Sequence, residues 1–164
     1  MRGKKILFLF LALMLPVCIF LFLKIFGKNR FDVPLLFQEK DDTFPTACGI
    51  DYQAPYMLPD SVLNMFRRNA ETPLYIISFA ADSTNLARVK NEIGEEELTI
   101  IQATSLPVDS SQFDFFRRCV MLLKSPADIV LVDDEKRIRG FYTASSRDEL
   151  DRLLVELNIL LNRY

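Results

Sequence analysis

A long apolar run opens the chain. It extends without a break from Ile6 to Leu23, and Ile25 and Phe26 continue it past Lys24. About twenty helical residues span the roughly 30 Å hydrocarbon core of a membrane, so we expect a transmembrane anchor over residues 6–26, after a short basic N-terminus at residues 1–5. Two alternatives stay open. A cleaved signal peptide would need a small-x-small site, which residues 26–30 do not offer, and a lipoprotein anchor at Cys18 lacks the small residue usually expected before it.

The next stretch, residues 27–55, has no clean hydrophobic period and contains several prolines. We expect a stalk that becomes a docked irregular segment, followed by a folded domain over residues 56–164. Short apolar stretches at Val33–Phe37 and Tyr56–Leu58 are candidate strands. The first would lie at a sheet edge, because proline cannot donate a ladder hydrogen bond.

Two apolar runs, Pro73–Phe79 and Leu98–Thr104, predict strands. Between them, an apolar stripe with 3-4 spacing predicts a helix, which Asp82 or Ser83 can cap and Gly94 can end. The stripe comprises Leu86, Val89 and Ile93. A strand, a helix and a second strand in this order favour a parallel pair with a right-handed crossover.

A second helix is predicted by Asp109 and Gln112, which have the spacing of a capping box. Its apolar face comprises Phe113, Phe116, Val120 and Leu123. Pro126 then ends the helical pattern just before the next strand. As a simple helix terminator it would follow a trans peptide bond, and the alternative is a cis bond. The sequence leaves both open.

The most legible segment is the stretch that follows. Ile129–Val132 is a β-branched apolar run, Asp133–Lys136 has the composition of a turn, and Arg137–Thr143 resumes as a strand. So short a connection permits only an antiparallel hairpin, because a parallel return needs a crossover. The hairpin therefore predicts a mixed sheet.

The last helix is opened by Ser146 and Glu149, a further capping-box spacing. Its core-facing stripe comprises Leu150, Leu153, Leu154, Leu157, Leu160 and Leu161. The predicted order is β-α-β-α-β-β-α, which is the core order of the thioredoxin-like fold. We therefore predict the α/β class, with a thioredoxin-like mixed sheet preceded by an N-terminal transmembrane helix.

Charge is distributed unevenly along the chain. All 22 acidic residues and 14 of the 20 basic ones follow Arg30, so residues 31–164 carry a net charge of −8. An acidic domain argues against nucleic acid as a partner and against a basic patch on anionic lipid. The basic residues that flank the apolar run are nearly balanced, but the amino-terminal charge and the long C-terminal domain favour a cytoplasmic N-terminus. We expect the soluble domain outside the cytoplasm, in the periplasm if the source is bacterial.

Three stretches together resemble the C-terminal part of the Sco/SenC family. They are Asp128–Asp133, Arg137–Tyr142, which contains Ile-Arg-Gly-Phe-Tyr, and the acidic, leucine-rich Arg147–Leu157. The resemblance covers roughly residues 126–161, and the membrane anchor is also similar. It implies a thioredoxin-like, membrane-anchored protein. Members of that family are copper chaperones for cytochrome oxidase assembly, some with thiol-redox roles.

The chemistry of that family uses a Cys-x-x-x-Cys after the first core strand and a distant histidine. The corresponding stretch here, Phe79–Leu86, has no cysteine, and the whole chain has no histidine. The copper site therefore carries over to no residue, and the resemblance implies a scaffold and a location. The sequence also shows no catalytic carboxylate pair, phosphate loop or nucleophile elbow.

Two cysteines remain in the soluble part, Cys48 and Cys119, and they are the candidate disulfide. In an oxidising compartment they could form a structural bond. They could equally be unpaired thiols, with Cys119 packed on its helix, or a redox-active pair. A soft metal site that adds Met57 and Met121 is a weaker alternative, because methionine at such spacings usually fills a core.

Our first functional hypothesis is a membrane-anchored, non-catalytic, thioredoxin-like domain that acts through contacts with an unknown protein partner. We predict no catalytic residue, metal or cofactor for it. The alternative is a thiol-disulfide oxidoreductase or copper-handling protein that uses Cys48 and Cys119. In either case Arg137 and Arg139 could pair with Asp133 or Glu135 at a solvated edge, or bind an anion.

Overall fold

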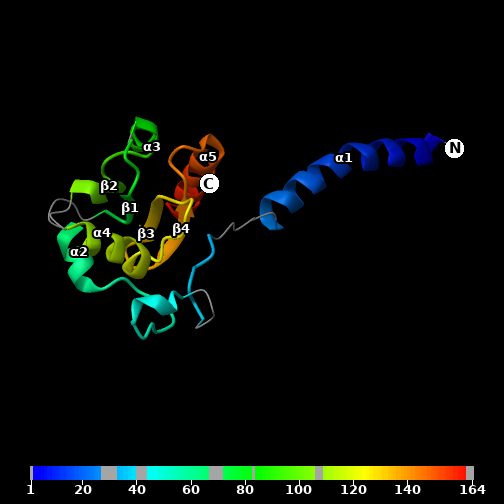
Figure 1. Ribbon diagram of the computed structural model, residues 1–164. Coiled ribbons are helices and arrows are strands. Elements are labelled where there is room, and N and C mark those ends of the chain that lie inside the picture. Colours follow the sequence, from blue (N-terminus) through cyan, green and yellow to red (C-terminus); the bar gives the residue numbers. More distant parts are fainter. Residues whose placement is uncertain are drawn as a thin grey trace. The chain divides into compact units, whose positions relative to one another are not determined.

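The computed structural model describes residues 2–26, 33–39, 44–66, 72–82, 84–105 and 109–161 (Figure 1). The chain divides into two units, Met1–Asp32 and Val33–Tyr164, which are described separately. Residues 33–39 and 44–55 thus belong to the same compact unit as the sheet, where the sequence placed a boundary at residue 56. The remaining parts of the proposed stalk, residues 27–32 and 40–43, lie outside the described residues.

The first unit is an apolar helix, α1, Arg2–Phe26. Its stretch Gly3–Phe22 has a mean hydropathy of 2.7 and is long and apolar enough to cross a membrane. The predicted anchor, residues 6–26, falls within it, and the helix already includes the basic residues before it. Length and composition of this kind suit a membrane anchor and also a signal sequence.

A four-stranded mixed sheet forms the centre of the second unit. Its strands are β1 (Leu74–Ser78), β2 (Leu98–Gln102), β3 (Ile129–Asp133) and β4 (Ile138–Tyr142), in the spatial order β2-β1-β3-β4. β1 and β2 are parallel, whereas β3 is antiparallel to β1 and to β4. The predicted strands, the parallel pair and the hairpin are therefore confirmed.

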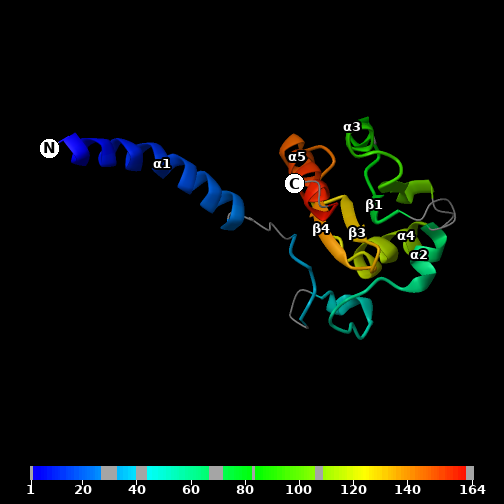
Figure 2. The ribbon, with the colours of Figure 1, turned by 180° about the vertical axis from the view of Figure 1, so that it is seen from behind.

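Two regular helices cover one side of the sheet, which we call the helical face (Figures 1 and 2). They are α3 (Thr84–Ile93) and α5 (Arg147–Leu160). The predicted stripe of α3 is buried, and so is that of α5 up to Leu157, whereas Leu160 and Leu161 are only partly buried. Asp82 accepts a hydrogen bond from the Thr84 amide at 2.8 Å, and Ser146 accepts one from the Glu149 amide. Ser83, the other candidate cap, lies outside the described residues. Gly94 ends α3 with φ of 103°, as predicted.

The opposite side, which we call the aromatic face, has a less regular cover (Figures 1 and 2). It is built from residues 33–58, α2 (Asp60–Phe66), α4 (Ser110–Phe115) and a π-helix, Phe116–Val120. Short 3-10 turns lie at Thr46–Cys48 and Ala103–Ser105. Rings of Phe37, Phe44, Tyr52 and Tyr56 contact one another in this cover, which gives the face its name.

Two expectations for this cover were wrong, and a third was confirmed only in part. The second helix starts at the predicted capping box but turns into a π-helix at Phe116. The candidate strands Val33–Phe37 and Tyr56–Leu58 are irregular. Each makes only an isolated backbone hydrogen bond to the hairpin, from Leu36 N to Ile138 O at 3.2 Å and from Leu58 N to Lys136 O at 2.9 Å. The first bond reaches β4, the outer strand of the hairpin, and partly satisfies its exposed edge, whereas the second reaches the turn that precedes β4.

A β-bulge interrupts the hairpin. Leu131 pairs with Gly140, but Val132 pairs with Ile138, so Arg139 is the extra residue. Because of the bulge, β4 residues before and after Arg139 point their buried side chains to opposite faces of the sheet. Ile138 packs on the aromatic face, whereas Tyr142 packs on the helical face.

Candidate functional site

The turn from β1 to α3 is where a Sco-like protein would carry its cysteines. Here Phe79 and Ala80 are buried, Ala81 is exposed, and Asp82 is used as a helix cap. Hydrogen bonds from the Thr84 hydroxyl and amide lower the pKa of Asp82. Phe79 contacts the rings of Phe113 and Phe116. The described part of this turn therefore provides packing and a cap, with no thiol or imidazole.

The two candidate cysteines lie elsewhere, on the aromatic face. A disulfide joins Cys48 and Cys119, with an S–S distance of 1.99 Å and Cα atoms 5.7 Å apart. It links the 3-10 turn Thr46–Cys48 to the π-helix, 71 residues away in the sequence. Cys119 is buried and Cys48 is half-buried. Of the alternatives that the sequence left open, the structure contains the bonded pair.

Two tyrosine hydroxyls reinforce the same junction. Tyr52 donates to the Cys119 carbonyl at 2.8 Å, and Tyr56 donates to the Val120 carbonyl at 2.7 Å. Carbonyls at the end of a helix lack intrahelical partners, so these bonds satisfy them. Burial raises the pKa of both hydroxyls, which keeps them protonated as donors. No sequence pattern predicts this role beyond the presence of two tyrosines in a proline-bounded loop.

The disulfide also lines a cavity of about 340 Å³. Pro45, Ala47 and Phe115 form its apolar wall, and Asp114 and Arg118 form an ion pair beside it. A π-helix is frequently found at functional sites. The cavity therefore places apolar and charged side chains beside the disulfide.

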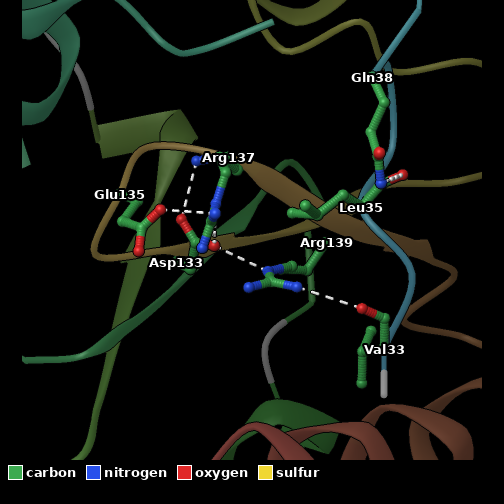
Figure 3. Close-up of polar contacts among 7 residues, drawn as sticks. All are labelled: Val33, Leu35, Gln38, Asp133, Glu135, Arg137 and Arg139. Carbon is green, nitrogen blue, oxygen red and sulfur yellow. Dashed lines mark hydrogen bonds and ion pairs between the residues drawn. The ribbon is translucent and has the colours of Figure 1, made fainter. Parts of the chain in front are cut away.

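A buried carboxylate organises the hairpin turn (Figure 3). Asp133 is 3% exposed and accepts hydrogen bonds from Arg137 Nε at 2.8 Å and from Arg139 Nε at 2.7 Å. Arg137 also pairs with Glu135. Arg139 donates through Nη1 to the Val33 carbonyl at 3.1 Å, which joins the hairpin to the start of the compact unit. The predicted pairing of Arg137 and Arg139 with Asp133 is confirmed, but the expected solvated edge was wrong, because Asp133 is buried and Arg139 is largely buried. Both guanidinium groups are occupied by the protein itself.

The Gly140-Phe141-Tyr142 part of the family-like motif has a packing explanation. A Cβ at Gly140 would lie 2.7 Å from Cζ and 2.9 Å from Cε2 of the Tyr142 ring, with the hydroxyl closer still. Tyr142 is fully buried, bonds to Glu156 and lies under the guanidinium of Arg152. These residues therefore have a structural role in packing β4 against α5.

The remaining candidate residues from the sequence are Pro126, Met57 and Met121. The Ser125–Pro126 bond is cis, as is Ala54–Pro55. Met121 is fully buried and Met57 is exposed. Among the described residues, no group of three or more His, Cys, Asp or Glu side chains could hold a metal ion.

Comparisons of the chain with family models, with curated proteins and with solved structures gave no match.

Proposed function

We propose that this chain is a membrane-anchored, Sco-like protein whose thioredoxin-like domain acts outside the cytoplasm through protein contacts and without catalysis. The strand and helix order from β1 to α5 supports the choice of fold family. The resemblance suggests assembly of an envelope or respiratory complex as its setting.

One observation carries the non-catalytic part of the proposal. The turn after β1, where a redox or copper site of this family would stand, holds Ala80, Ala81 and the capping Asp82. The two cysteines of the domain are instead bonded to each other at a junction that Tyr52 and Tyr56 also hold. This combination is typical of a structural cross-link.

The location rests on two features. The apolar helix α1 is long enough to anchor the chain. Disulfides persist in oxidising compartments and are rare in the cytosol, so a bonded Cys48–Cys119 pair supports a domain outside the cytoplasm.

The test uses the full chain, solubilised from membranes in a mild detergent. We expect a defined protein to copurify with it, while the chain shows neither dithiol-disulfide exchange with a peptide disulfide nor stoichiometric binding of Cu(I). The matched variant is Cys48→Ser with Cys119→Ser. Exchange or copper binding that disappears in this variant, while its helix content is retained, would overturn the proposal.

The cavity beside the disulfide favours a second candidate, a thiol-disulfide oxidoreductase or copper-handling protein that uses Cys48 and Cys119. In exchange, a partner thiolate would attack Cys48 Sγ and Cys119 would leave as the thiolate. Arg118, which lines the same cavity, could stabilise that charge. The same pair of assays separates the two candidates.

A further inference from the structure

A second cavity, of about 620 Å³, opens on the aromatic face. It lies where residues 35–39 meet β4 and the loop that follows the π-helix. Its apolar walls comprise Leu35, Leu36, Phe37, Leu122 and Phe141, and its polar rim comprises Gln38, Glu39 and Lys124. Its volume falls in the range of about 300–1,000 Å³ that is usual for ligand sites.

Two of its wall residues have an unusual backbone. Phe37 has φ of 57° and Leu122 has φ of 53°, a conformation that residues with a side chain rarely adopt. Phe37 is held in place by the Tyr56 amide, which donates to its carbonyl at 3.0 Å, and by ring contacts with Phe44 and Phe141. Such conformations persist only where the surroundings enforce them, and they cluster at binding sites.

The charge on the rim is the most specific feature. Lys124 is exposed, and its ammonium group makes no ion pair or hydrogen bond with the described residues, although the domain carries an excess of acidic residues. Within the described part of the compact unit, every other Lys or Arg side chain has such a partner. Glu39 lines the same cavity, yet no ion pair joins it to Lys124. The rim thus offers one charge of each sign beside an apolar pocket.

We propose that this cavity binds a short segment of the partner protein in which an apolar side chain lies between an acidic and a basic residue. The apolar side chain fills the pocket, the acidic residue pairs with Lys124, and the basic residue pairs with Glu39. The assignment rests on the proposed function, because it gives that protein contact a place. A segment with both charges matches the rim, whereas an anionic lipid would match Lys124 alone and would be repelled by the acidic domain.

The chain has no tryptophan, so a tryptophan in a probe peptide can be excited selectively. The probes are two capped pentapeptides, Asp-Ala-Trp-Ala-Lys and its reverse, titrated with the full chain in dodecylmaltoside micelles. We expect saturable binding of at least one probe, with a blue shift of its emission as the indole leaves water. Lys124→Glu should weaken binding about tenfold, since it replaces a charge-assisted hydrogen bond with repulsion. Changing the acidic residue of the probe to lysine should restore binding to that variant.

The matched control is Lys90→Glu, an exposed lysine on α3 of the helical face, which should leave probe binding unchanged. The proposal fails if neither probe saturates or if empty micelles give the same signal. It also fails if Lys124→Glu and Lys90→Glu weaken probe binding equally. Displacement of the probe by phosphatidylethanolamine would identify a lipid as the occupant and would also overturn it. If the copurifying protein is retained by Lys124→Glu, the cavity is rejected and the proposed function stands. Thiol exchange by the cysteines would reject that function without changing probe binding.

Discussion

The two faces of the sheet share β1 and β3 but are covered in different ways. The helical face is covered by α3 and α5, which begin at side-chain caps and pack through regular apolar stripes. The aromatic face is covered by irregular residues 33–58, by α2 and by a helix that widens into a π-helix. Its cover is held by single, long-range bonds, among them the disulfide and the hydroxyls of Tyr52 and Tyr56.

This difference distinguishes the features that any domain of this fold would need from those that are particular to this protein. The helical face could belong to any domain with this order of elements, because its apolar stripes require only that apolar residues recur at helical spacing. The aromatic face carries both described cavities, the disulfide, and Phe37 and Leu122, whose φ angles are positive. Surfaces that bind are commonly built from loops on a rigid scaffold, so we expect function on the aromatic face.

The largest expected effect comes from removing the disulfide. The bond closes a loop of 71 residues, and the chain-entropy model gives about 4 kcal/mol for a loop of this size. Cys48→Ala with Cys119→Ala should therefore lower the free energy of urea unfolding by about 4 kcal/mol. Native-state hydrogen exchange should show the loss of protection first in residues 44–58 and 116–123.

Amides of α3 and α5 serve as the internal control for this variant. If they lose protection at the same denaturant concentration as residues 44–58, the two faces unfold as one unit, and the proposed difference between their covers is wrong. The single variants Cys48→Ala and Cys119→Ala should each lose as much as the double variant, since one sulfur cannot form the bond.

The second prediction concerns Asp133, which joins the hairpin to Val33 through Arg139. Asp133→Ala leaves two largely buried guanidinium groups without their carboxylate, a loss of about 3 kcal/mol for a broken buried pair. Thermal unfolding of the full chain in micelles should report it. Asp134→Ala is the matched control, because that neighbouring carboxylate is exposed. Equal losses in the two variants would assign the effect to the turn rather than to the buried pair.

The sequence predicted the helical face well because its signals are local. Leu86, Val89 and Ile93 repeat at helical spacing, and Asp82 and Ser146 lie where caps are needed. It predicted the pairing of Arg137 with Asp133, four residues away, for the same reason.

The aromatic face was predicted poorly because its determinants are distant in sequence. The change from α-helix to π-helix at Phe116 was not predicted. The carbonyls of Cys119 and Val120, at the end of that π-helix, accept hydrogen bonds from tyrosines of the distant docked loop. The structural bond between Cys48 and Cys119 was one of four open alternatives, because spacing alone does not bring two cysteines together. No local pattern predicts that the Lys124 ammonium has no ion-pair partner among the described residues, because that property depends on every neighbour in the fold.

The third prediction tests the helical face at its tightest contact. Gly140→Ala would place a Cβ against the Tyr142 ring, which cannot withdraw because Arg152 and Glu156 hold it. Overpacking of this kind costs about 2 kcal/mol. The measurement is urea unfolding, combined with Tyr142→Leu in a double-mutant cycle. The two changes should be strongly non-additive, and additive losses would mean that the ring is not what excludes a side chain at Gly140.

The smallest expected effect is a loss of stability in alkaline solution. It can be compared for one tyrosine from each face. Burial raises the pKa of Tyr142, to which the bond to Glu156 also contributes, and burial raises that of Tyr56, with a further contribution from Tyr52. A raised phenol pKa means that the folded state favours the neutral form. The resulting stability is fully present below the unfolded value near pH 10 and is lost as pH rises towards the folded value. Above about pH 10, Tyr142 should reduce stability by roughly 1.4 kcal/mol per pH unit.

Tyrosinate absorbance at about pH 11 measures this directly, because the folded chain should show less of it than the urea-unfolded chain. Tyr142→Phe and Tyr56→Phe should each remove part of that difference. If Tyr56 ionises together with partial unfolding of residues 44–58 while Tyr142 stays neutral, the cover of the aromatic face opens before the helical face. If both tyrosines ionise in a single step that coincides with global unfolding, the two covers are equally stable in spite of their different construction.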